Sequence, residues 1–253
     1  GTVAGFALAA QKYGTLPLST LLAPAIKLAR DGIIVNDALA DDLATYGKEN
    51  LINHDNSRAL FYKADGQPYQ KGDRLVQKNL AHSLQLIAQQ GPDAFYKGKI
   101  ADEIAAEMAQ HGGLIGKADL AAYRAVERKP VSGSYRGYEV FSMPPPSSGG
   151  IHIVQILNIL ENFDLAKWGF GSADAMQVMA EAEKYAYADR SEYLGDPDFV
   201  KVPQQALTSK AYAKTLAQQI DVNKARPSAD IKPGKLAPYE SNQTTHFSVV
   251  DKD

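Results

Sequence analysis

The sequence contains no cysteine among its 253 residues. Disulfide bonds, thiolate metal sites and a cysteine nucleophile are therefore excluded. The absence does not fix a compartment, because both cytosolic and periplasmic proteins can lack cysteine. The five histidines are scattered, and none forms the helical His-Glu-x-x-His arrangement of a zinc protease.

Charge of either sign is not in excess, and long apolar runs are missing. The formal net charge is −2, which gives no basic footprint for nucleic acid. Without a polybasic run or a long apolar stretch, no membrane insertion is expected. Apolar residues make up 45% of the chain and charged residues 22%. This is the balance of a globular protein of one large or two small domains.

Both ends suggest part of a longer or processed polypeptide. The sequence begins Gly1-Thr2-Val3, without methionine and without a recognisable signal peptide. Its last residues, Asp251-Lys252-Asp253, follow an apolar pair and are typical of the start of a turn.

Hydrophobic spacing predicts that most of the chain is helical. Val76, Leu80, Leu84 and Ile87 form a helical stripe, and Ser172 is placed to cap the longest helix. Residues 50–73 are polar and broken by glycine and proline, so they are expected to be irregular. The helices expected are 3–13, 20–30 with Ser19 as cap, 37–46, 75–90, one ending at Gly112-Gly113, 151–163, 173–194 and 210–220.

Two segments favour strands. Residues 123–143 alternate in polarity and predict a β-hairpin that turns at Arg136-Gly137. Residues 244–250 are short, β-branched and aromatic, and predict a strand. Between the last helix and this strand, residues 221–243 carry prolines among charged residues, which is typical of an exposed, extended connector.

The start of the last predicted strand carries the most chemistry. A threonine hydroxyl needs a base, and a chain-terminal threonine can use its own α-amine, whose pKa is about 7.7–8.0. Thr244 could become such a residue if its Oγ attacked the carbonyl of Gln243, formed an ester, and water then separated the two chains. Two threonines at the start of a strand are common, however, so the pattern alone favours an ordinary strand. His246, on the same face as Thr244, is open to either a supporting or a local packing role.

Other polar clusters have simpler interpretations. The run Pro144–Gly150 is expected to be a rigid loop that starts a helix, with anion binding as the less favoured alternative. Asp41-Asp42 and Asp102-Glu103 are expected to face solvent. The stretch Glu181–Arg190 mixes charged, small and aromatic residues. It predicts either a buried polar helix that holds a neighbouring sheet or a surface helix, and neither is catalytic.

Several stretches together resemble the γ-glutamyltranspeptidase family, and its bacterial members most closely. The resemblance runs along the whole chain. It is carried by Gly1–Phe6, Asp119–Tyr123, Met143–Gly150, Ala180–Arg190 and Thr244–Asp251.

The resemblance implies a precursor that cleaves itself between Gln243 and Thr244. Residues 1–243 would then be part of a large subunit and 244–253 the start of a small one. Thr244 would be the catalytic nucleophile, taking the γ-glutamyl group of glutathione or related γ-glutamyl compounds as an ester. Water, an amino acid or a peptide would accept it. The implied fold is α+β, a helix-rich part of the αββα sandwich of N-terminal-nucleophile hydrolases. The implied location is the periplasm, with no metal or organic cofactor.

The resemblance also implies that other active-site groups lie outside these residues. An arginine for the substrate carboxylate would precede Gly1. The oxyanion-hole glycines and the serines and aspartate that hold the glutamyl group would follow Asp253, in the remainder of the small subunit. The 253 residues alone are therefore expected to be inactive. A related amidase, such as a cephalosporin or glutaryl acylase or a poly-γ-glutamate-processing enzyme, remains an alternative, as does a helical binding module without catalysis.

Overall fold

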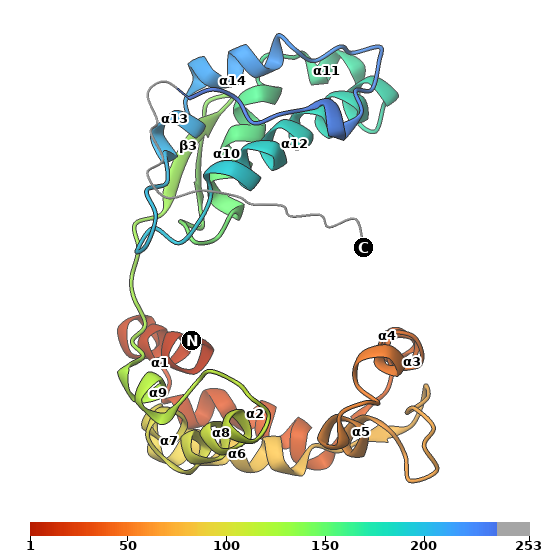
Figure 1. Ribbon diagram of the computed structural model, residues 1–253, viewed down its shortest axis with the longest axis vertical. Coiled ribbons are helices and arrows are strands. Elements are labelled where there is room, and N and C mark those ends of the chain that lie inside the picture. The colour runs from red at the N-terminus through yellow and green to blue at the C-terminus, as the bar shows by residue number, and fades with distance from the viewer. Residues whose placement is uncertain (237–253) are drawn as a thin grey trace, which may run out of the picture. The chain divides into compact units, whose positions relative to one another are not determined.

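A computed structural model describes residues 1–236 of the chain (Figure 1). The chain divides into two compact units, of which the first is Gly1–Val126 and the second begins at Glu127. Helices dominate both units, and the described strands form two antiparallel pairs. Within residues 1–236, no helix has the length and apolar character to cross a membrane. The expected subunit boundary at Gln243-Thr244 lies outside the described residues.

In the first unit, helices surround a core to which Ile87, Ala94 and Ile100 contribute buried side chains. α2 and α6 pack against each other, and Tyr96 stacks on Tyr123 with ring centroids 5.4 Å apart. The elements are α1 (Thr2–Tyr13), α2 (Leu18–Asp31), β1 (Ile33–Ile34), α3 (Asp37–Ala44), α4 (Tyr46–Asn50), α5 (Asp55–Phe61), β2 (Arg74–Leu75), α6 (Lys78–Gln90), α7 (Asp93–Tyr96), α8 (Lys99–Gln110) and α9 (Lys117–Ala122).

Two predictions for this unit were wrong, and one pair of strands was missed. α2 begins at Leu18 with Pro17 as its N-cap, so Ser19 lies inside the helix. The Pro17 carbonyl accepts the N–H groups of Thr20 and Leu21. Residues 50–73 contain a helix, α5, where an irregular segment was expected. The β1–β2 pair was missed because two residues per strand are too few to show a period.

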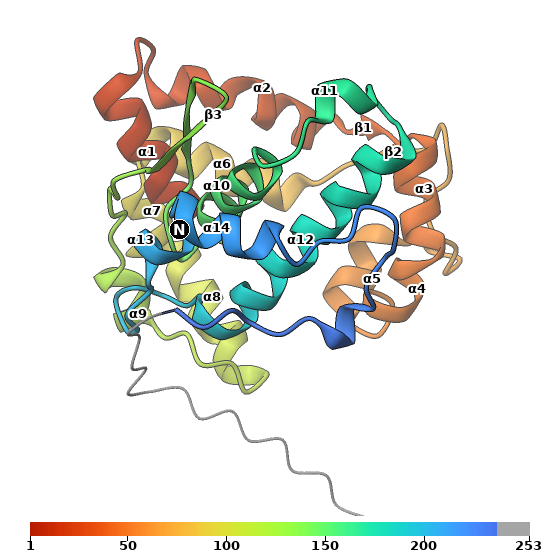
Figure 2. The same ribbon diagram turned by 90° about the horizontal axis from the view of Figure 1, so that it is seen from above.

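The second unit is organised around one helix. Its elements are β3 (Val131–Tyr135), β4 (Tyr138–Ser142), α10 (Gly149–Leu160), α11 (Leu165–Trp168), α12 (Ala173–Tyr193), α13 (Gln204–Leu207), α14 (Lys210–Ala217) and the 3₁₀ turn η1 (Ser228–Asp230). α10 contacts the β3–β4 hairpin, α12, α13 and α14 (Figures 1 and 2). Ile151, Val154 and Ile159 on α10 are almost completely buried, so this helix supplies much of the apolar contact that stabilises the unit.

The hairpin is confirmed at its predicted turn. Tyr135 pairs with Tyr138 across Arg136-Gly137. Both turn residues have positive φ, 48° and 88°, the backbone that a two-residue hairpin turn requires. The hairpin is shorter than predicted, because β3 begins only at Val131.

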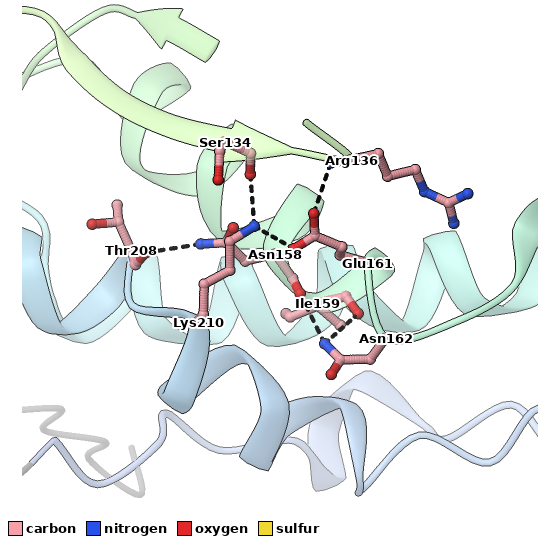
Figure 3. Close-up of polar contacts among 8 residues, drawn as sticks. All are labelled: Ser134, Arg136, Asn158, Ile159, Glu161, Asn162, Thr208 and Lys210. Atoms are coloured by element: carbon pink, nitrogen blue, oxygen red, sulfur yellow. Dashed lines mark hydrogen bonds and ion pairs between the residues drawn. The ribbon is translucent and has the colours of Figure 1, made fainter. Parts of the chain in front are cut away.

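A polar network joins the hairpin turn to α14 (Figure 3). Glu161 accepts the backbone N–H of Arg136 at 2.7 Å through Oε1, and Oε2 forms an ion pair with Lys210. The Lys210 ammonium also donates to the Ser134 carbonyl at 2.7 Å. These donors, Lys210 first and the Arg136 N–H second, lower the pKa of the Glu161 carboxyl.

We expect Glu161→Gln to lower the free energy of unfolding at pH 7 by about 0.2–1 kcal/mol, because the pair is partly exposed to solvent. Glu161 has a lowered pKa in the folded state, so its contribution is present above about pH 4 and is lost as pH falls through the folded pKa. Urea unfolding at pH 7 and near pH 3 would measure both values. A difference between wild type and variant that grows on acidification would contradict the assignment.

Candidate functional site

The predicted nucleophile, Thr244, and its neighbour Gln243 lie outside the described residues. His246 and the expected strand at 244–250 lie outside them as well. The described chain nevertheless includes most of the connector that precedes the junction. We therefore built the candidate site from residues 221–236 and the side chains that contact them.

Most described residues of the connector are exposed, as its composition predicted, but it is anchored to the second unit at a few positions that the sequence did not indicate. Ile231 is buried in the core beside Val178, Ala182 and Tyr185 of α12. η1 forms one short turn within the segment. The anchoring was not predicted, because one apolar residue and two backbone N–H groups give no pattern in a segment rich in proline and charged residues.

The first contact of the connector with α12 is at Arg226. The carboxylate of Glu181, which is 1% exposed, accepts the Arg226 backbone N–H at 3.0 Å. Lys184, one turn along α12, donates to the same carboxylate and to the Arg226 carbonyl, both at 2.7 Å. The guanidinium of Arg226 donates to the Tyr185 hydroxyl at 2.9 Å. Both polar groups of the Arg226 residue backbone are thus bound by α12.

The second contact is at Gly234, and it has the same form. Asp189, also 1% exposed, accepts the Gly234 N–H at 2.8 Å through Oδ1. The hydroxyl of Tyr193 donates to the Gly234 carbonyl at 2.6 Å. The other carboxylate oxygen, Oδ2, accepts the Tyr212 hydroxyl at 2.7 Å and the side-chain amide of Gln155. Asp189 therefore joins α10, α12, α14 and the connector.

Only glycine fits at position 234. A Cβ built there would overlap the hydroxyl and the ring carbons of Tyr212. The tyrosine is itself held by its hydrogen bond to Asp189, so it is not free to move aside. Gly234 thus allows the connector backbone to approach the buried carboxylate closely.

Burial dominates the electrostatics of this cluster. It raises the pKa of the Asp189 carboxyl, against the hydrogen bonds from Gly234, Tyr212 and Gln155 that favour the ionised form. Burial and the neighbouring carboxylate raise the pKa of the Tyr212 phenol, so it stays protonated and donates. Burial also lowers the pKa of His152, which keeps the imidazole neutral at pH 7.

The orientation of Gln155 fixes the tautomer of His152. Because the Gln155 amide nitrogen donates to Asp189, its oxygen is free to accept, and His152 Nδ1 lies 3.0 Å from it. Nδ1 therefore carries the proton. His152 Nε2 is then a bare acceptor, and it is buried without a hydrogen-bond partner among the described residues.

The loop before α10 has the expected role as a helix start, with one difference. Ser148 occupies the N-cap but makes no side-chain cap bond. The hydroxyl of Ser147 instead accepts the Gly149 N–H at 3.3 Å. A Cβ at Gly150 would overlap the backbone carbonyl of Met143, which explains the glycine. Asp41, Asp42, Asp102 and Glu103 are exposed, as predicted.

Of the two interpretations offered for Glu181–Arg190, the buried polar helix is confirmed, with a correction to what it holds. Glu181 and Asp189 bind the connector, Asp189 also binds neighbouring helices, and within residues 1–236 neither carboxylate is hydrogen-bonded to a strand. Sequence reasoning missed Gln155, Tyr212 and Gly234. The only local signal was the Pro-Gly pair at 233–234, which is equally typical of an exposed turn.

Comparison with known proteins decides the family. The family model described as gamma-glutamyltranspeptidase matches residues 1–253, the whole chain. The chain belongs to the γ-glutamyltranspeptidase family. It is 76% identical over 253 residues to the glutathione hydrolase proenzyme of Escherichia coli (strain K12). That match covers 100% of this chain and 43% of the Escherichia coli protein.

Two further relatives bear on fold and specificity. The crystal structure of Helicobacter pylori γ-glutamyltranspeptidase matches with a TM-score of 0.89 and 46% sequence identity, over 96% of this chain and 69% of that chain. The acylase ACY 1 proenzyme of Pseudomonas sp. (strain SE83) is 45% identical over 252 residues, 99% of this chain and 44% of that protein. The expected helix-rich α+β fold, part of an N-terminal-nucleophile hydrolase, is confirmed. The chain spans less than half the length of either proenzyme.

Proposed function

We propose that the full-length protein is a self-processing γ-glutamyltransferase and glutathione hydrolase whose nucleophile is Thr244. The observation that carries the proposal is the Gln243-Thr244-Thr245-His246 junction within a chain that matches this family from its first residue to its last. The name of the Escherichia coli relative, a glutathione hydrolase proenzyme, supports both the substrate and the need for processing.

The proposed chemistry uses one hydroxyl twice. In processing, Thr244 Oγ attacks the carbonyl carbon of Gln243, the peptide nitrogen leaves, and water hydrolyses the resulting ester. This frees the α-amine of Thr244, which near neutral pH is partly unprotonated and accepts the proton of Oγ. In turnover, Oγ attacks the γ-glutamyl carbonyl of glutathione and the amine of the remaining peptide leaves with a proton. Water, an amino acid or a peptide then takes the glutamyl group from the ester.

The proposal extends to partners and location. The donors are glutathione and other γ-glutamyl compounds, and the remainder of the small subunit completes the site. The expected location is the periplasm. The reaction as proposed needs no metal or organic cofactor. No nucleic acid or membrane insertion enters it.

A related amidase activity is the second candidate, favoured by the 45% identity to an acylase proenzyme. We expect the full-length protein to turn over glutathione and a γ-glutamyl anilide at least tenfold faster, in kcat/KM, than a glutaryl amide that lacks the α-amino group. A site whose polar groups bind the substrate α-amino group rejects an analogue without it more strongly than an apolar pocket rejects one extra methylene. Parallel assays would measure the ratio, and preference for the glutaryl amide would instead support an acylase.

A further inference from the structure

We propose that α12 is a template that positions the chain ahead of the cleavage junction, with buried Glu181 and Asp189 holding the backbone at Arg226 and Gly234. The inference rests on the proposed self-cleavage before Thr244. It assigns Glu181, Asp189, Tyr193 and Gly234 as positioning residues, because none of them is proposed to touch the reacting atoms.

The two contacts form a matched pair. Glu181 and Asp189 are eight residues apart on α12, and Arg226 and Gly234 are eight residues apart on the connector. The connector therefore runs parallel to α12, and Figures 1 and 2 both draw the two side by side. At each contact a buried carboxylate accepts the backbone N–H, and a side chain three or four residues further along α12 donates to the carbonyl.

The path between the contacts has a fixed length. Eight helical residues rise about 12 Å, whereas eight extended residues span up to about 26–29 Å. η1 and the buried side chain of Ile231 lie between Arg226 and Gly234 and shorten the connector along this path. The contacts thus set both the direction and the register of the connector as far as Gly234.

Glu181 and Asp189 bind the backbone of the connector, which favours a role in positioning the connector over a role in core packing alone. Buried carboxylates are expensive unless fully hydrogen-bonded, and apolar side chains fill a core more cheaply. Here both carboxylates use an oxygen on a backbone N–H of the connector. The glycine at 234 admits that backbone and no larger residue.

The consequence for processing follows from chain length. Thr244 lies ten positions after Gly234 and 27 positions after Ala217, the end of α14. If both contacts were lost and the chain were free back to Ala217, the free segment before Thr244 would lengthen from ten to 27 residues. By the loop-closure relation, the chain would then reach a fixed site about fourfold more slowly. If Ile231 stays buried, the last fixed point is 13 residues away and the same relation gives about 1.5-fold.

Asp189→Asn tests the second contact directly. Asparagine has one oxygen in place of two, yet Asp189 accepts from Gly234 on one side and from Tyr212 and Gln155 on the other. Whichever way the amide is turned, its NH₂ faces a donor and at least one contact is lost. At Glu181 one oxygen, Oε1, accepts both the Lys184 ammonium and the Arg226 N–H. Glutamine could keep an oxygen there, so Glu181→Ala is the variant that removes the acceptor. Gly234→Ala removes the close approach without changing any charge, and Tyr193→Phe removes a single hydroxyl.

The experiment follows cleavage of the full-length precursor after cell-free synthesis, by intact mass over time. We expect Glu181→Ala/Asp189→Asn to cleave about 1.5- to fourfold more slowly than wild type, and Gly234→Ala and Tyr193→Phe to slow cleavage to a smaller extent. Once cleaved, each variant should keep the kcat and KM of wild type for a γ-glutamyl anilide. The mild Tyr193→Phe variant keeps the test decisive if the double variant fails to fold.

Asn158→Ala is the matched control. Asn158 is buried on α10 in the same unit, and its side chain donates to the Thr208 carbonyl at 2.8 Å without contacting the connector (Figure 3). We expect it to lower the unfolding midpoint but to cleave at the wild-type rate. The proposal would be overturned if the template variants cleaved at the wild-type rate. It would also be overturned if Asn158→Ala slowed cleavage as much as the template variants do.

A Thr244→Ala precursor separates this proposal from the one it rests on. If that precursor stays intact while the template variants cleave at the wild-type rate, only the template is wrong. If Thr244→Ala is itself cleaved before residue 244, the proposed self-cleavage fails, and with it the basis of the template.

Discussion

Replacing Thr244 with alanine in the full-length protein should leave a single uncleaved polypeptide with no measurable γ-glutamyl transfer. The substitution removes the only oxygen proposed to attack the Gln243 carbonyl, so the ester that precedes cleavage cannot form. Without cleavage the α-amine of residue 244 stays in a peptide bond and cannot serve as a base. Intact mass would show one chain in place of two, and release of the anilide from a γ-glutamyl anilide would measure turnover.

Two neighbouring variants control for general damage at the junction. Thr244→Ser keeps a hydroxyl at the reacting position, so it should still cleave and turn over. Thr245→Ala removes the adjacent hydroxyl, which the proposed chemistry does not use, and should be processed. If Thr244→Ala changed neither cleavage nor activity, the nucleophile would be elsewhere. If the full-length protein showed no turnover of any amide, a non-catalytic binding module would become the better explanation.

The parts of the fold that sequence predicted well are those whose stability is local. The hairpin turn at Arg136-Gly137 has positive φ at two successive residues. Glycine adopts positive φ readily, so its presence in the sequence indicates such a turn. Ser172 caps α12 by accepting the Ala175 N–H at 3.2 Å, as the sequence indicates. Each of these signals involves residues within a few positions of one another, so one sequence contains it.

The attachment of the connector to α12 could not be predicted, because the residues that hold the connector are distant from it in sequence. Glu181 and Asp189 look like members of an ordinary charged helix until Arg226 and Gly234, some 45 residues later, are seen to bind them. The need for glycine at 234 likewise depends on Tyr212, which belongs to another helix. The family resemblance is the basis for proposing Thr244 as the nucleophile, but only the structure relates the connector before it to α12.

The 253 residues alone should show no measurable transferase activity, even with Thr244 present. The family resemblance places the oxyanion-hole donors and the groups that bind the glutamyl carboxylate and amine outside this stretch, and the chain covers 43% of its Escherichia coli relative. Loss of even one oxyanion donor typically costs about 2.7–4 kcal/mol of transition-state stabilisation, a factor of about 10²–10³. Loss of the substrate-binding groups removes positioning as well.

The measurement is turnover of a γ-glutamyl anilide by the purified 253-residue chain, with the full-length protein assayed in parallel. Intact mass should find one species, because self-cleavage before Thr244 also passes through a tetrahedral oxyanion and depends on the same stabilisation. Two pieces divided at Gln243-Thr244 would show that the groups needed for processing lie within these residues. Turnover that Thr244→Ala abolishes would show more, that a working oxyanion site is already present within residues 1–253.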